Sequence, residues 1–234
     1  MATVILARHG RTTANADGIL AGRSGGVHLD EHGRQQATKA AERLRDLPLA
    51  RAVSSPMERC RETAALLVDG RGVEVSTEQR LTECDYGDWT GRSMKDLVKE
   101  DLWKVVQAHP AGVRFPGGEA MAEMSARAVS AVRDIDAAVE EEQGAEAIWL
   151  AVSHGDVIKA ILADALGVHL DQFQRIVVDP ASLSVVRYTA TRPFVLGVNS
   201  SAGSLAHLVA ERAEKPEESI GGGAGSHAGA GTGH

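Results

Sequence analysis

Residues 3–10 read TVILARHG, a short apolar run that becomes polar and then reaches a glycine. The apolar part, Thr3 to Ala7, is too short for a helix and is rich in β-branched residues, which is typical of a buried strand. We expect this strand to end at Arg8, His9 and Gly10. Because ligands of parallel sheets bind beyond the carboxyl ends of the strands, this strand end marks a candidate site.

Two later segments repeat this organisation, each with a short apolar strand, a polar junction and then a helix. Ala52 to Ser54 lead into Ser55-Pro56-Met57-Glu58, and Ala147 to Val152 lead into Ser153-His154-Gly155-Asp156. The helix after the second of these junctions is apolar and extends to about Leu166. Strands that alternate with helices predict an α/β fold, a three-layer α/β/α sandwich with a mostly parallel central sheet.

The junction at Ser55 has the composition of a helix start. Ser55 can act as the N-cap, Pro56 suits the first helical position, and Glu58 can complete a capping box. This pattern predicts a helix that begins directly after Ser55 and continues to about Val68.

Apolar spacing and turn formers predict the remaining elements. One helix has Asp30 as its N-cap and Pro48 as its stop, and its apolar face is formed by Leu29, Ala37, Ala40, Ala41, Leu44 and Leu47. We also expect helices at Lys95 to Gln107 and Glu119 to Glu142, a loop at residues 81–91, and closing strands at Ile176 to Val178, Leu183 to Tyr188 and Phe194 to Val198. The closing strands lack long helices between them, which favours an antiparallel arrangement there. Met121 and Met124 are expected in the core.

Residues 1–199 contain all of these elements and are expected to form one domain, since 43% hydrophobic residues in a chain of 234 suit a single ordinary core. The composition changes after Asn199, and the sequence finishes GGGAGSHAGAGTGH. So much glycine cannot bury a core, and we expect residues 200–234 to be a disordered tail. Its histidines are too far apart to favour a metal site, namely His207, His227 and His234.

The charge balance and the cysteine content exclude several classes of protein. A formal net charge of −7 disfavours general attraction to nucleic acid or to anionic membranes, and no apolar run approaches the ~18 residues of a membrane span. Cys60 and Cys84 are a poor disulfide framework and suit a reducing cytoplasm. The N-terminus also lacks the pattern of a signal peptide. We therefore expect a cytoplasmic protein that holds any anionic substrate with a local cluster of cations.

Four side chains meet at one pocket if the three strands are neighbours: Arg8, His9, Arg59 and His154. Arg59 lies about one turn into its helix, and helical side chains lean toward the N-terminus, so its guanidinium can reach back to the strand end. Arg61 points to a different face of the helix and is the weaker candidate.

Such a pocket suits phosphoryl chemistry. Two arginines match phosphate oxygens through planar, bidentate contacts, and helix N-termini add amide donors. One histidine can attack phosphorus while the other donates to the phosphoryl oxygens. The leaving alkoxide needs a proton donor, which Glu83, Asp85 or Asp88 can supply. Each of these residues alone has an ordinary structural explanation. It is their occurrence together, at equivalent strand-to-helix junctions, that favours a phosphate-handling site.

Four motifs in sequence order resemble those of the histidine phosphatase superfamily. LARHGRTTAN at residues 6–15 resembles its L-x-R-H-G-x-T-x-x-N signature, and SSPMERCRETA at residues 54–64 resembles its S-S-P-x-x-R-x-x-x-T-A segment. Leu81-Thr82-Glu83 with Gly87, Trp89 and Gly91 resembles L-x-E-x-x-x-G-x-W-x-G, and VSHG at residues 152–155 matches V-S-H-G. Together the motifs cover most of the expected domain.

The resemblance implies a phosphoglycerate-mutase-like fold in which residues 1–199 are the catalytic domain. It implies that His9 accepts the phosphoryl group, that Arg8, Arg59 and His154 complete the phosphate pocket, and that Asn15 contacts phosphate or substrate. Glu83 would act as general acid and later as base for water. It also implies a two-step route through phosphohistidine, with no metal and no cofactor, in a monomer or homodimer.

Two departures bear on the reaction. Cofactor-dependent mutases of the family typically have an arginine directly after the acid, where this chain has Cys84, and the segment from Gly22 to Gln36 departs from the G-W-x-D-x-P-L pattern. The glycines at residues 22–26 have neither the Walker nor the Rossmann spacing. These features favour hydrolysis of a small phosphomonoester. A cofactor-dependent phosphoglycerate mutase is the alternative, and a non-catalytic phospholigand-binding protein is a third hypothesis.

Overall fold

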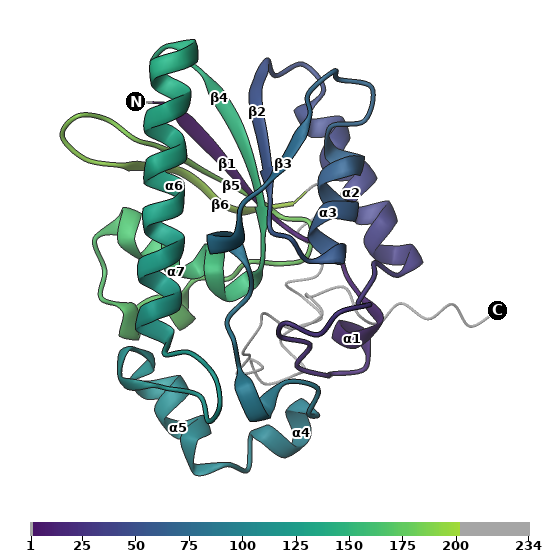
Figure 1. Cartoon of the computed structure of the whole chain (residues 1–234), viewed down its shortest axis with the longest axis vertical. Coiled ribbons are helices and arrows are strands. Elements are labelled where there is room, and N and C mark those ends of the chain that lie inside the picture. Colours follow the sequence, from purple (N-terminus) through teal and green to yellow (C-terminus); the bar gives the residue numbers. More distant parts are fainter. Residues whose placement is uncertain (1, 202–234) are drawn as a thin grey trace, which may run out of the picture.

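The computed structural model describes residues 2–201, which form a six-stranded sheet covered by helices on both faces (Figure 1). The strand order is β3-β2-β4-β1-β5-β6. The four strands β1 to β4 are parallel, whereas β5 runs antiparallel to β1 and β6 antiparallel to β5. The predicted three-layer sandwich with a mostly parallel sheet and antiparallel closing strands is therefore confirmed.

The bounds of the elements lie close to the predicted ones in most cases. The strands are β1 (Thr3–Arg8), β2 (Leu49–Ser54), β3 (Val75–Thr77), β4 (Ile148–Ser153), β5 (Leu183–Arg187) and β6 (Phe194–Ser200). The helices are α1 (Thr13–Ala16), α2 (Glu31–Leu44), α3 (Glu58–Leu67), α4 (Met94–Leu97), α5 (Asp101–Ala108), α6 (Met121–Gln143) and α7 (Gly155–Leu166). Short 3₁₀ turns lie at Gln79–Leu81, Gly87–Trp89, Pro110–Gly112 and Leu170–Arg175.

Alternating residues of the central strands divide the core between the two faces of the sheet. Val4 and Leu6 of β1 pack into the larger cluster with α6 and α7, which includes the fully buried Met121 and Met124. Ile5 and Ala7 of the same strand pack on the other face in the cluster of α2 and α3. This alternation follows from the two-residue period of a strand, and because both faces are covered, β1 is apolar at every position from Val4 to Ala7.

The predicted start of α3 is wrong. The helix begins at Glu58 with Met57 as its N-cap, and no side chain caps it. The Ser55 hydroxyl instead hydrogen-bonds Nε2 of His154 at 2.8 Å, and its hydrogen bond from the Met57 amide is a longer 3.4 Å. By contrast, Asp30 caps α2 as predicted, because its carboxylate accepts a hydrogen bond from the Gly33 amide.

Three other expectations require correction. The segment predicted as one helix at Lys95 to Gln107 is divided into α4 and α5. Ile176 to Val178 is not a strand, because the carbonyl of Val178 turns inward to accept from the Arg8 guanidinium. The short elements α1 and β3 were not anticipated. The predicted tail lies outside the described residues from residue 202 onward, and β6 extends to Ser200, one residue past the expected boundary.

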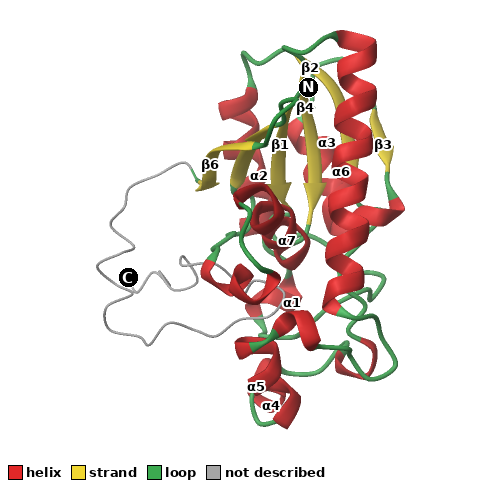
Figure 2. Ribbon diagram, turned by 90° about the vertical axis from the view of Figure 1, so that its left-hand side faces the viewer, coloured by secondary structure: helices red, strands yellow, loops and turns green. Residues whose placement is uncertain are grey.

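The helices α4 and α5 lie beyond the carboxyl ends of the parallel strands, at the end of the molecule opposite the N-terminus (Figure 1, Figure 2). The segment between the strands and these helices carries Glu83 toward the sheet edge where β1, β2 and β4 end. No helix within residues 2–201 has both the length and the apolar character needed to span a bilayer. Cys60 and Cys84 are both buried and free.

Candidate active site

The register of the three central strands brings the predicted junctions together. β4 lies between β1 and β2, with Arg8 opposite Ser153 and Ser54 opposite Val152. The residues that follow these strands therefore emerge at the same edge of the sheet. The rings of His9 and His154 meet edge to face, with centroids 5.4 Å apart.

His9 has a ring nitrogen free for nucleophilic attack. Its Nδ1 lies 2.7 Å from the backbone oxygen of Gly10. Because a carbonyl can only accept, Nδ1 carries the proton and Nε2 keeps its lone pair. Burial, together with the neighbouring Arg59 and Arg8, holds the pKa of His9 well below its usual value. The histidine is thus neutral in the free protein, which is the form that can attack phosphorus.

The backbone around His9 is fixed from two sides. The Gly10 amide donates to the Thr63 hydroxyl of α3 at 3.0 Å. The Ala181 amide donates to the carbonyls of both Arg8 and His9, at 3.1 Å each. Ala181 adopts a left-handed conformation with φ of 57°, which is strained for a residue with a Cβ. Rigid support of this kind keeps the imidazole in one orientation.

Arg8 and Arg59 place two buried guanidinium groups beside His9. Arg8 is 1% exposed and donates through Nη1 to the Val178 carbonyl at 2.8 Å. Arg59 is 2% exposed and donates through Nη2 to the Gly22 carbonyl at 2.8 Å. Its Nη1 is buried and has no hydrogen-bond partner within residues 2–201. A buried donor without a partner is costly, and an anionic ligand would satisfy it.

His154 is held between an arginine and a serine. Nη2 of Arg59 donates to its Nδ1 at 3.1 Å, so Nδ1 is the acceptor and Nε2 donates to the Ser55 hydroxyl at 2.8 Å. Burial, followed by the charge of Arg59, holds the pKa of His154 well below its usual value. In the free protein His154 therefore orients Arg59 and is itself neutral.

Glu83 is the acidic group of this pocket. It is 3% exposed, and its Oε2 lies 3.8 Å from Nδ1 of His154. Burial and the negative charge of Asp156 raise the pKa of Glu83 to about 7, against the opposing effect of Arg59 and Arg8. A carboxyl that titrates near neutral pH can donate a proton and later accept one. Asp88 is exposed and Asp85 is half-buried toward Arg23, so neither reaches the histidines.

Asp156 belongs to a second, deeper layer of the site. It is fully buried in the first turn of α7, and its Oδ2 accepts from the Tyr86 hydroxyl at 2.8 Å. The ammonium of Lys159 lies 3.8 Å from its Oδ1. Tyr86 is on the same loop as Glu83. Its hydrogen bond to Asp156 therefore keeps the negative charge of Asp156 near the Glu83 carboxyl.

Two of the residues considered from the sequence, Arg61 and Asn15, form no hydrogen bond with the side chains of the pocket within residues 2–201. Arg61 is exposed on α3, in agreement with its lower ranking. The Asn15 side-chain oxygen accepts from the amide and the hydroxyl of Thr12, which caps α1. A contact of Asn15 with phosphate or substrate stays a prediction.

Several residues of the site were not anticipated from the sequence. Ser55 and Thr63 lie within a motif that pointed to Arg59 only, and nothing in the sequence signals the inward turn at residues 178–181. Within residues 2–201, no group of three or more His, Cys, Asp or Glu side chains is arranged to hold a metal ion.

Residues 4–201 match the profile of the histidine phosphatase superfamily (branch 1). The match covers all but the first two of the described residues. The chain therefore belongs to this superfamily of enzymes.

The proteins similar to this chain include one named as a mutase and one named as a phosphatase. A Yersinia enterocolitica protein named probable phosphoglycerate mutase GpmB is 33% identical over 211 residues, which cover 89% of this chain and 95% of that protein. Bacillus stearothermophilus YhfR has a similar structure, with a TM-score of 0.78 and 28% identity over 87% of this chain and 98% of the other. A mycobacterial glucosyl-3-phosphoglycerate phosphatase gives a TM-score of 0.77 and 27% identity, over 85% and 99% of the two chains.

Proposed function

We propose that this protein is a metal-independent phosphomonoesterase that hydrolyses a small phosphorylated metabolite through a phosphohistidine at His9. The observation that carries the proposal is the pairing of a neutral His9, whose Nε2 lone pair is free, with Glu83, a buried acid of pKa about 7. The nucleophile and the proton donor of a two-step transfer thus share one pocket with two buried arginines.

In the first step, Nε2 of His9 attacks phosphorus and the bond from phosphorus to the ester oxygen breaks. Glu83 gives its proton to that oxygen, so the alcohol leaves neutral. In the second step the Glu83 carboxylate takes a proton from water, whose oxygen attacks the phosphohistidine. Inorganic phosphate leaves, and His9 regains its lone pair. Arg8 and Arg59 balance the charge of the phosphoryl oxygens in both steps.

The alternative reaction is phosphoglycerate mutation, which the name of the Yersinia relative favours. A mutase must hold the dephosphorylated intermediate so that phosphate returns to it. The Cys84 side chain, at the position where family mutases typically carry an arginine, is buried and lies 3.8 Å from the Met121 sulfur. This placement leaves the intermediate without that cation and supports hydrolysis. The phosphatase among the similar structures supports it too.

The test begins with hydrolysis of p-nitrophenyl phosphate in EDTA by the wild type and by His9→Ala. We expect turnover that is unaffected by EDTA and absent from the variant. Loss of activity in EDTA, or activity that survives in His9→Ala, would contradict the proposal. Phosphate binding without turnover at any pH would instead favour a non-catalytic phospholigand-binding protein.

A second assay separates hydrolysis from mutation. Supplying 3-phosphoglycerate with a catalytic amount of 2,3-bisphosphoglycerate should release inorganic phosphate or leave the substrate unchanged. Conversion to 2-phosphoglycerate faster than phosphate release would identify a mutase. A panel of sugar, glycerate and nucleoside phosphates then ranks substrates by kcat/KM.

A further inference from the structure

Three charged residues outside the phosphate pocket hold the loop that carries the acid. We propose that Arg127, Glu119 and Arg23 are positioning residues that fix Glu83 for proton transfer by bracing its backbone. This inference rests on the proposed hydrolytic function and adds residues whose role is to aim its general acid. We call these three residues the acid brace.

Arg127 of α6 joins the helix to the acid-bearing segment. Its Nη1 donates to the carbonyls of Arg80 and Thr82, each at 2.7 Å, and its Nη2 donates to the carbonyl of Glu83 at 3.1 Å. One rigid guanidinium thus ties three carbonyls within four residues to a single helical position. Lysine has a point charge on a flexible stem and cannot reproduce this fork.

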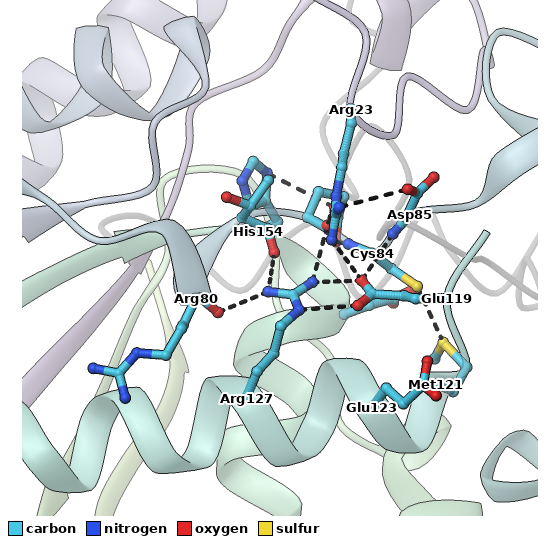
Figure 3. Close-up of polar contacts among 12 residues, drawn as sticks. Arg23, Arg80, Cys84, Asp85, Glu119, Met121, Glu123, Arg127 and His154 are labelled. Atoms are coloured by element: carbon cyan, nitrogen blue, oxygen red, sulfur yellow. Dashed lines mark hydrogen bonds and ion pairs between the residues drawn. The ribbon is translucent and has the colours of Figure 1, made fainter.

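Glu119 lies between the two arginines of the brace and accepts hydrogen bonds from both of them (Figure 3). Its Oε1 accepts from Nη2 of Arg127 at 2.6 Å, from Nη2 of Arg23 at 2.9 Å and from the Asp85 amide at 2.9 Å. Its Oε2 accepts from Nε of Arg127 at 3.0 Å. The carboxylate therefore holds both arginines and also the backbone two residues after Glu83.

The position of Glu119 is set by close backbone packing. Its amide donates to the Asp85 carbonyl at 3.0 Å, and the Asp88 amide donates to the Pro116 carbonyl at 2.8 Å. A Cβ at Gly118 would lie 2.2 Å from the Asp85 oxygen, so only glycine fits there. The segment with Glu119 and the segment with Glu83 thus form one unit.

Arg23 connects this unit to the phosphate pocket. Its Nε donates to the Glu83 carbonyl at 2.9 Å, next to the hydrogen bond from Arg127. The preceding residue, Gly22, accepts through its carbonyl from Nη2 of Arg59. Arg59 and Glu83 are therefore both attached to the same two residues of the loop. This arrangement sets the distance between the bound phosphoryl group and the proton donor.

The brace is expected to act on proton transfer and not on phosphate binding. Misplacement of a catalytic group by ~1 Å can cost ~10²-fold in rate. A general acid matters most when the leaving group is a poor one such as an alkoxide, and little when it is p-nitrophenolate, which leaves without a proton. Glu83 also acts as base in the second step, which is the same for both substrates, whereas kcat/KM reports only the steps up to the phosphohistidine. Damage to the brace should therefore lower kcat/KM selectively for the poor leaving group, and a general loss of structure should lower it equally for both substrates.

The experiment compares an alkyl phosphomonoester, glycerol 3-phosphate, with p-nitrophenyl phosphate in the wild type, Arg127→Met, Arg127→Lys and Arg23→Met. The matched control is Arg133→Met, because Arg133 lies on the same helix and pairs with Asp164 on the surface. We expect kcat/KM for the alkyl ester to fall by ~10²-fold in Arg127→Met and ~10-fold in Arg23→Met. Losses of kcat/KM with p-nitrophenyl phosphate should be several times smaller, and the control should match the wild type with both substrates.

Equal losses of kcat/KM with the two substrates would overturn the inference. Arg23→Met changes a partly exposed side chain and keeps the test valid if Arg127→Met unfolds, which thermal melting will reveal. If the wild type lacks His9-dependent turnover, the proposed function itself fails. If the wild type turns over and the variants lack selectivity, only the brace fails.

Discussion

At the scale of single residues, Glu83 is the group on which the chemistry depends most closely. Its carboxyl is buried next to two buried arginines and close to the fully buried Asp156. Burial and the like charge of Asp156 outweigh the attraction of the arginines, and the pKa rises to about 7. A raised pKa means that ionisation of Glu83 is less favourable in the folded protein than in the unfolded chain. Ionisation of Glu83 must therefore lower the free energy of unfolding.

Glu83→Gln should abolish turnover of alkyl esters and change the pH dependence of stability. Between pH 4.5 and about 7 the folded protein retains a proton that the unfolded chain has released, so the wild type loses stability as the pH rises. Glutamine resembles the protonated acid and avoids this loss. We expect equal free energies of unfolding at pH 4 and an advantage of about 2–3 kcal/mol for the variant at pH 8. Urea denaturation at both pH values measures this, and a variant less stable at pH 8 would contradict the assignment.

Asp156→Asn should lower the pKa of Glu83, because the substitution removes a negative charge and keeps an acceptor for Tyr86. The positive charges of Arg59 and Arg8, which lower the pKa of Glu83, are then opposed by burial but no longer by a second carboxylate. Glu83 would release its proton at lower pH, and the alkaline limb of kcat/KM for an alkyl ester should move down by about 1 pH unit. Asp136→Asn, at another fully buried aspartate that bonds Trp149, is the control and should leave the limb in place. A limb that moves upward would argue against this electrostatic role.

At the scale of elements, the site depends on close contacts between the helices and the junctions. Gly33 in the first turn of α2 packs directly on the loop after His9. A Cβ at Gly33 would lie 2.0 Å from the Arg11 oxygen, and one at Gly10 would lie 2.5 Å from the Gly33 oxygen. Two backbones meet here without side chains, so the helix fixes the loop that carries the nucleophile.

Gly33→Ala should therefore damage both stability and catalysis. The new methyl group meets backbone atoms that cannot rotate away, so α2 must separate from the loop. We expect a loss of about 1–3 kcal/mol in the free energy of unfolding and a fall in kcat with p-nitrophenyl phosphate. Lys39→Gly, at an exposed position of α2, is the control and reports the effect of helix propensity. A Gly33→Ala variant with wild-type activity and stability would contradict the contact.

The elements that the sequence predicted well are those whose pattern is local. The buried strands β1 and β4 and the capped helix α2 follow from short apolar runs and from Asp30. The start of α3 could not be predicted, because the Ser55 hydroxyl is used by His154, a residue distant in sequence. The inward turn at Val178 depends in the same way on Arg8.

The candidate site shows the same distinction. Sequence motifs pointed to the two histidines and two arginines of the pocket and to Glu83, because each lies near a strand end or on the loop after β3. The acid brace was not, because Arg23 and Arg127 look like solvated charges until the fold brings them to one carbonyl. Tertiary hydrogen bonds of this kind leave no periodic signal in the sequence.

At the scale of the whole molecule, the edge of the sheet and the pocket are connected. The Asn199 side chain on β6 accepts from the Asp179 amide at 2.6 Å and donates to the Asp179 carboxylate at 2.9 Å. The next residue toward the N-terminus, Val178, accepts from Arg8. The final strand thus helps to hold the arginine of the pocket, although it lies at the edge of the sheet.

Truncation should show where the catalytic domain ends. A chain that stops after residue 201 retains β6 and the contacts of Asn199, and we expect it to match the full chain in melting temperature and kcat/KM. A chain that stops after residue 193 loses the strand and the support of Val178, and it should melt earlier and lose activity. Equal behaviour of the two truncated chains would contradict the connection between β6 and the pocket.

The central claim is that a phosphoryl group passes through His9, and rapid-quench trapping of the labelled enzyme tests it most directly. Wild-type protein mixed with a ³²P-labelled phosphomonoester should acquire a label that survives alkali and is lost in acid, as a phosphohistidine requires. Peptide mapping should place the label on His9, and His9→Ala should remain unlabelled. A label on another residue, or steady turnover with no labelled enzyme at any quench time, would contradict the account.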